Sequence, residues 1–81
     1  MRYYFHVKDG VDSLDEVGSE FADFELVRCE LLRFTGELLS QASPNFWDHA
    51  PWMVWVTDTS GTTVLSVNIS AEVAKSELKS D

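Results

Sequence analysis

Basic residues and cysteine are both scarce in this sequence of 81 residues, and each shortage excludes a class of function. Six Lys and Arg stand against fourteen Asp and Glu, which gives a formal net charge of −8. A nucleic-acid phosphate backbone would be repelled by such a chain, so we expect no nucleic-acid partner. The single cysteine, Cys29, excludes an internal disulfide and fits a reducing compartment.

Long hydrophobic runs are missing as well. There is no apolar stretch of about 18 residues and no signal peptide, so we expect neither a membrane span nor export, and we expect a cytoplasmic location. The length corresponds to one small domain, residues 1–81. Three Trp, five Phe and two Tyr must supply most of its core.

The clearest periodic pattern covers residues 23–42 and predicts an α-helix. Its apolar side chains recur at helical spacing and form one stripe: Phe24, Val27, Leu31, Phe34 and Leu38. Glu30, Arg33 and Glu37 lie on the opposite side at spacings that bring opposite charges together. Asp23 is expected to cap the first turn.

Three other segments alternate with period two and predict strands: residues 2–8, 52–57 and 63–69. Asp9-Gly10 predicts a turn, after which residues 11–14 form a short return strand. The fold class is therefore α+β: a two-layer sandwich with one long helix packed on one face of an antiparallel sheet. The sheet has three to four strands, in ββαββ order. Residues 71–81 are expected to form a short helix or a frayed tail.

Strand alternation gives the predicted sheet two unlike faces. The face expected under the helix carries Tyr3, Phe5, Val7, Val54, Val56, Leu65 and Val67. The opposite face carries a candidate partner surface formed by Tyr4, His6, Met53 and Trp55. Three interpretations stay open: a partner or a second copy binds there, the C-terminal segment and Trp47 partly cover it, or the rings stack on the bases of a single strand. The third lacks the positive groove that base-stacking platforms need.

Half of the acidic residues fall between Lys8 and Arg28, with no basic residue among them. A solvated acidic loop is the simpler interpretation, and a patch that attracts a basic partner is the alternative. The candidate acidic patch consists of Asp9, Asp12, Asp15, Glu16 and Glu20.

No motif predicts a catalytic residue, a cofactor or a metal. His6 and His49 match no metal-ligand spacing and are interpreted as a surface strand histidine and a loop histidine. The acids at every third position lack the alternate spacing of a calcium loop. Asp58 fits a hairpin aspartate that bonds its own backbone, and Cys29 fits a small apolar filler.

Three blocks carry a family resemblance: RYYFHVKDG from Arg2, DEVGSEF from Asp15 and WMVWVTDTSG from Trp52. They resemble a family of short uncharacterised proteobacterial proteins, a domain of unknown function, whose members open with R-Y-F-F-H-V-x-D-G and close with W-x-I-x-V-x-D-x-x-G. The resemblance extends to about Ile69. It implies a shared small α+β fold and no assigned activity, cofactor or site. The loop SPNFWDHAP departs from the family pattern in its aromatic content.

These observations favour a non-catalytic protein-interaction module, homodimeric in one version through the open sheet face or an exposed strand edge. One alternative is an acidic regulator that binds a basic partner protein, similar only in layout to small antitoxin domains. Another is a small enzyme with an unrecognised site. That alternative requires a pocket joining His6 or His49 to Asp58 or to a tyrosine hydroxyl.

Overall fold

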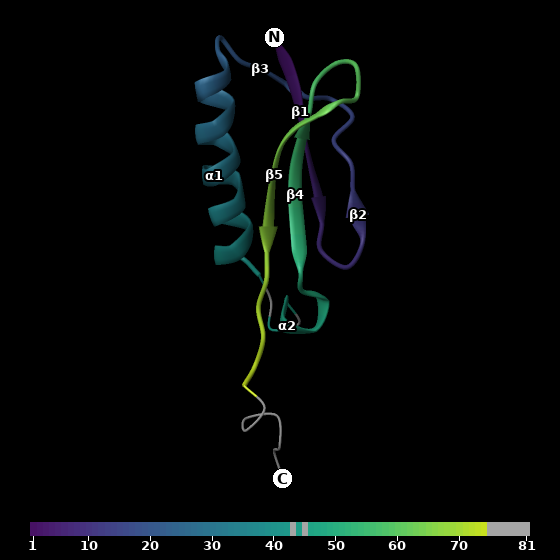
Figure 1. Cartoon of the computed structure of the whole chain (residues 1–81), viewed down its shortest axis with the longest axis vertical. Helices are drawn as coiled ribbons and strands as arrows, with labels where there is room; N and C mark the ends of the chain where they lie inside the picture. The colour runs from purple at the N-terminus through teal and green to yellow at the C-terminus, as the bar shows by residue number, and fades with distance from the viewer. Residues whose placement is uncertain (43, 45, 75–81) are drawn as a thin grey trace.

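A computed structural model describes residues 1–42, 44 and 46–74 of the chain. In chain order its elements are β1 (Arg2–Lys8), β2 (Asp12–Ser13), β3 (Ser19–Glu20), α1 (Phe24–Ser40), α2 (Phe46–His49), β4 (Trp52–Thr57) and β5 (Thr63–Ile69). The strands form one antiparallel sheet, and α1 lies along one side of it (Figure 1). The predicted α+β class is therefore confirmed.

Helix α1 begins where the sequence predicts. The Oδ1 atom of Asp23 accepts a hydrogen bond from the Leu26 N–H at 3.1 Å, which satisfies a donor that the first turn leaves free. On the solvent side, Arg33 Nη2 lies 2.7 Å from Glu30 Oε2, in the predicted ion pair. Within the part of the chain that the structure describes, neither helix has the length and apolar content needed to cross a bilayer.

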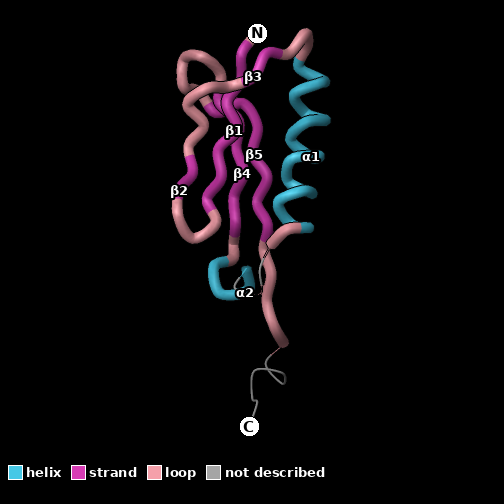
Figure 2. The backbone as a smooth tube through the Cα atoms, turned by 180° about the vertical axis from the view of Figure 1, so that it is seen from behind, coloured by secondary structure: helices cyan, strands magenta, loops and turns pink. Residues whose placement is uncertain are grey.

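The sheet order is β2-β1-β4-β5, and β3 also pairs with β1, as the backbone trace shows (Figure 2). In the β1–β4 pair, Tyr4 lies opposite Thr57, and His6 lies opposite Trp55. Directly opposed residues of an antiparallel pair share a face. This register therefore separates the aromatic residues of β1 into two sets.

The helix-side set forms the core. The Tyr3 ring contacts Phe21 and Phe24, and the Phe5 ring lies 6.0 Å from Phe34 of α1. The buried core cluster consists of Tyr3, Val7, Val27, Leu31, Val54 and Val56. The predicted helix-side face is confirmed, and the register places Tyr4, His6, Met53 and Trp55 on the other face.

Short elements account for the differences from the prediction. The two-residue strand β3 and the four-residue helix α2 lie in segments predicted as connections, since neither is long enough to show a period. Residues 71–74 form no helix, which corrects that part of the helical alternative for the tail. The rest of that prediction, residues 75–81, lies outside the described residues.

Two neighbouring leucines of α1 test the packing. Leu31 is 4% exposed and Leu32 is 68% exposed. Replacing Leu31 by Ala should lower the free energy of unfolding by about 2–5 kcal/mol, because it empties a closely packed site. Leu32→Ala should change it by less than about 1 kcal/mol. Urea denaturation of dilute protein measures both, and equal effects would contradict the assigned helix face.

Candidate functional site

The outer edge of β1 is closed by residues 12–20, a segment we call the return segment. Val7 pairs with Ser13, and Tyr3 pairs with Ser19. Five residues, 14–18, therefore face the three residues 4–6 of β1, and the backbone ladder is interrupted between the two pairings. Most of the side chains described below, Asp15 and His6 among them, lie at this interruption of the ladder.

The Asp15 carboxylate fills the gap in the ladder. Its Oδ2 accepts a hydrogen bond from the Phe5 N–H at 3.2 Å, replacing the missing strand partner. Its Oδ1 accepts from the Val17 and Gly18 N–H groups, each at 3.0 Å. Asp15 was predicted only as one member of an acidic patch. The structure gives it an internal role, because its oxygens face backbone donors of the bulge.

His6 is held from both sides and is 9% exposed. The Asp15 N–H donates to His6 Nδ1 at 3.1 Å, and His6 Nε2 lies 2.9 Å from Thr57 Oγ1. Since Nδ1 accepts a hydrogen bond, the proton of the neutral ring is on Nε2, which donates to the Thr57 hydroxyl. The interpretation of His6 as a surface histidine is therefore wrong. The return segment covers the ring, so it is not an exposed contact residue.

This hydrogen-bond arrangement argues against a catalytic role for His6. A general base for the Thr57 hydroxyl would need a free lone pair on Nε2, but that nitrogen carries the proton. Thr57 is also buried, at 9% exposure. The His6–Thr57 pair joins β1 to β4 and serves the fold.

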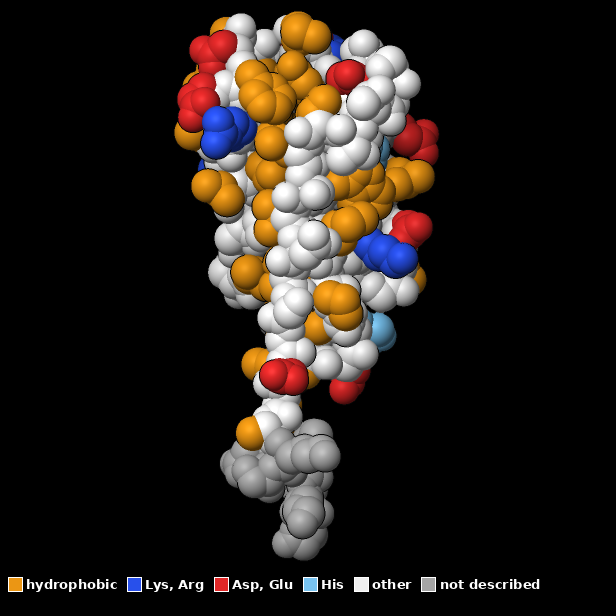
Figure 3. Space-filling view, viewed as in Figure 1, with side chains coloured by type: hydrophobic (Ala, Val, Ile, Leu, Met, Phe, Trp, Pro, Cys, Tyr) orange, Lys and Arg blue, Asp and Glu red, His pale blue; other side chains and the backbone are white. Residues whose placement is uncertain are grey.

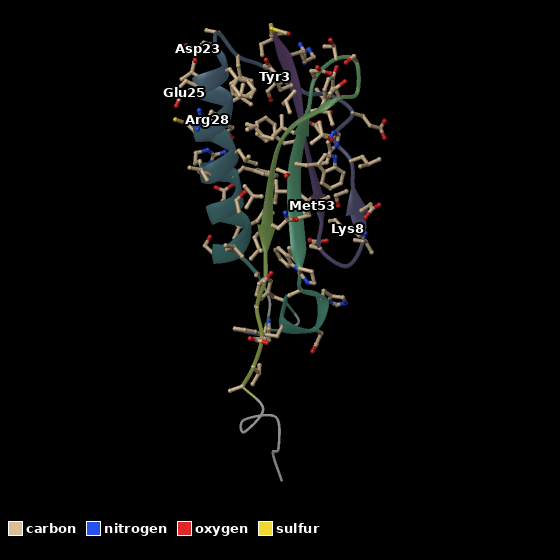
Figure 4. All side chains as sticks on the ribbon, viewed as in Figure 1. Tyr3, Lys8, Asp23, Glu25, Arg28 and Met53 are labelled. Atoms are coloured by element: carbon tan, nitrogen blue, oxygen red, sulfur yellow. The ribbon has the colours of Figure 1, made fainter. Side chains whose placement is uncertain are left out.

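The other members of the predicted partner surface are half-buried. The His6 and Trp55 rings lie 5.1 Å apart between centroids, so Trp55 rests partly on His6. Gly18 lies directly on the Tyr4 ring: a Cβ there would come within 2.8 Å of it. Met53 pairs with Lys8, and Figure 4 shows both on the side of the sheet away from α1. Residues 15–18 supply the cover found here, and most of the C-terminal segment named in the alternative lies outside the described residues.

The residues of the predicted acidic patch also differ in their environments. Glu20 forms salt bridges with Arg2 and with the N-terminal amine, at 3.1 and 3.4 Å. Asp15 faces the backbone. Among the described residues, Asp9, Asp12 and Glu16 form no salt bridge, and they remain the unpaired acids of this edge.

Three aliphatic side chains of the same edge were not singled out by the sequence reasoning. Val11, Leu14 and Val17 are 69%, 61% and 76% exposed. They alternate in sequence with the acids. Their regular spacing of three residues was the feature of the sequence that could have identified them. The edge therefore offers exposed apolar side chains that alternate in sequence with negative charges.

A separate cavity of about 500 Å³ lies where the β1–β2 turn meets α2 and the end of α1. Asp9, Gln41, His49 and Trp52 are among the residues that line it. His49 packs on Gly10, where a Cβ would lie 2.8 Å from the imidazole. Neither Asp58 nor a tyrosine lines this cavity, so it is not the pocket that the enzyme hypothesis requires. The described residues contain no group of three or more potential metal-ligating side chains.

Asp58 and Cys29, the remaining candidates for chemistry, do not lie where a site would require them. Asp58 Oδ1 accepts hydrogen bonds from the Ser60 and Thr62 N–H groups, as a hairpin aspartate should. The Ser60 hydroxyl and these backbone donors lower the pKa of Asp58. Cys29 is exposed on α1, so its interpretation as a core filler is wrong.

The hydrogen bonds of Asp15 set a pH dependence. Burial raises its pKa, but the N–H groups of Gly18, Val17 and Phe5 outweigh burial and hold the pKa below the ordinary value of 3.8. A carboxyl with a lowered folded-state pKa stabilises the fold above its unfolded-state value. It loses that contribution as the pH falls through the folded-state pKa.

Asp15→Asn should therefore lower the free energy of unfolding by about 2 kcal/mol at neutral pH, since it weakens three charge-assisted bonds. The difference from wild type should shrink as the pH falls below the ordinary value of 3.8. Asp12→Asn is the control, because Asp12 is exposed on the same segment. Denaturant titrations between neutral pH and pH 2 measure this, and a pH-independent difference would contradict the assignment.

Comparison with known proteins supplies a family. The model of one protein family, described as Domain of unknown function (DUF6894), matches residues 2–70. No curated protein and no solved structure matches the chain. The match spans the three blocks that carried the resemblance and includes every strand of the sheet.

Proposed function

The chain belongs to the DUF6894 family, and on that premise we propose that it is a non-catalytic protein-interaction module. The proposed partner is a protein with an apolar surface surrounded by basic residues. It would bind the return segment together with residues 9–11 before it and the adjoining part of the sheet face that α1 leaves open. We propose a cytoplasmic location, which the lone cysteine supports.

The observation that carries the proposal is the exposure of Val11, Leu14 and Val17. Single exposed aliphatics are ordinary, but three on one short edge segment are an unusual use of apolar surface. The fold itself does not need them outside, because its core is filled from α1 and the opposite face of the sheet. A partner that covers them gains the free energy of burying them.

Charges near the three aliphatics in sequence support the chemistry of the partner. Asp9, Asp12 and Glu16 alternate with them along the chain and form no salt bridge among the described residues. Unpaired charges at the rim of an interface steer association and reject partners of like sign. A basic partner is therefore favoured over an acidic one.

Trp55 and Met53 support an extended contact. Both are half-buried, and Trp55 is held by its contact with His6. Large side chains held in place are typical anchors of protein interfaces, because less entropy is lost when they bind. In Figure 3 hydrophobic side chains also gather on the side of the sheet away from α1.

Substitution of the aliphatics tests the proposal. Proteins captured by the wild type would be purified and titrated against variants by calorimetry. Leu14→Ser combined with Val17→Ser should weaken binding by about tenfold or more. Leu26→Ser is the matched control, since Leu26 is exposed on α1 at 49% and should leave the affinity unchanged. Equal affinity of the double variant and the control would refute the assigned surface.

Salt dependence tests the proposed charge of the partner. Neutralising the rim with Asp12→Asn and Glu16→Gln should slow association and flatten the decrease of the association rate with ionic strength. Stopped-flow measurements at several salt concentrations detect both effects. An association rate that ignores salt, or a partner with an acidic contact surface, would remove this part of the proposal.

A further inference from the structure

Strand β5 is the free edge of the sheet. It ends the order β2-β1-β4-β5, and none of its seven residues is buried, whereas four of the six residues of β4 are. In Figure 1 it crosses in front of the upper end of β4 and then lies beside it. In the same view Figure 3 shows a strip of backbone and small polar side chains with hydrophobic side chains on both sides. One long backbone edge is therefore accessible.

The hydrogen bonds at the β2/β3 edge determine which backbone groups of β5 point outward. The N–H of Phe5 bonds to Asp15, and the backbone groups of Met1 bond to Phe21. The odd-numbered residues of β1 thus point away from β4. Because these directions alternate along an antiparallel strand, His6 and its alternate neighbours bond to β4.

The same alternation carries through to β5. Trp55, opposite His6, points its backbone groups toward β1, so Val54 and Val56 point theirs toward β5. Their partners in β5, Val67 and Leu65, are then bonded to β4. The outward N–H and C=O groups of the strand belong to Val64, Ser66 and Asn68. No described residue donates to or accepts from them at this edge.

The two edges of the sheet differ in the features that prevent pairing with another chain. The β2/β3 edge is made of two-residue strands, a bulge and the charged side chains of Asp12 and Glu20. These are devices by which sheet edges avoid association. Strand β5, Thr63–Ile69, has no charge and no proline, and its one register shift lies near its first residues, opposite Val56 and Thr57. From Leu65 to Ile69 it keeps a regular edge without such protection.

We propose that a second copy of the chain pairs with β5, antiparallel, about a two-fold axis at Ser66. Ser66 then lies opposite Ser66 of the second copy, and Val64 lies opposite its Asn68. Each of these pairs exchanges two backbone bonds, which gives about six hydrogen bonds across the axis. On the helix side, Leu65 meets Val67 of the second copy and extends the apolar layer.

The charge distribution favours a second copy as the occupant. Two chains of net charge −8 repel one another in general. Strand β5 itself is uncharged, and the acids of the return segment lie on the opposite edge of the sheet. Pairing through β5 keeps those acids at the two far ends of the joined sheet. It also leaves the return segment free, so this inference goes beyond the proposed function and does not depend on it.

Disulfide capture tests the axis. In a Cys29→Ser background, Ser66→Cys places two thiols on Cα atoms about 5.5 Å apart, within disulfide range. Asn68→Cys is the matched control on the same strand and face, with its two copies about 14 Å apart. With oxidised glutathione as oxidant, Ser66→Cys should give a crosslinked dimer in most of the protein, and Asn68→Cys should stay monomeric. Equal crosslinking of the two variants would overturn the proposed register.

Light scattering gives an independent readout without cysteines. The wild-type mass should rise with concentration from 9.2 kDa toward twice that value. Ser66→Glu opposes two carboxylates at the axis and should abolish the rise, whereas Ser19→Glu, on the opposite edge, should leave it unchanged. A wild-type chain that stays monomeric at millimolar concentration would overturn the proposal, as would a dimer that Ser66→Glu leaves intact.

Discussion

The register between β1 and β4 is the constraint on which the rest of the structure depends. It places His6 opposite Trp55 and Val7 opposite Val54, so one set of aromatic rings packs under α1 and the other set lies on the opposite face. A slip by one residue would move every side chain of a strand to the other face. The His6–Thr57 hydrogen bond, made between buried side chains of β1 and β4, holds this register.

One carboxylate completes the outer side of β1. Asp15 lies within five residues that span three, and it bonds to the backbone that this mismatch leaves unpaired. The same insertion contains the exposed Leu14 and Val17 and places a backbone donor against His6. Closure of this edge and two of its exposed apolar side chains thus belong to one irregularity. The opposite edge, β5, has one register shift near its first residues and no such closure along Leu65–Ile69.

The sequence predicted those elements whose side chains follow a regular period. The Asp23 cap, the α1 stripe and the alternation of β4 each involve residues a few positions apart. The cap and the alternation are found as predicted, whereas the stripe is buried at Val27 and Leu31 but 40% exposed at Phe24. The role of Asp15 and the burial of His6 depend on a segment without any period, folded back on β1 by long-range pairing. The alternation of β4 was enough to assign Trp55 to a face of the sheet. Its contact with His6 could not be predicted, because that contact depends on the register between β1 and β4.

Amide hydrogen exchange along β5 measures the central claim most directly, because it reports both the register and the open edge. In dilute protein the amides of Leu65 and Val67 should be protected, while those of Val64, Ser66 and Asn68 exchange rapidly. At high concentration the second set should become protected as well. Protection of all five amides at every concentration would mean that the edge is covered within one chain. Rapid exchange at Leu65 and Val67 would contradict the register itself.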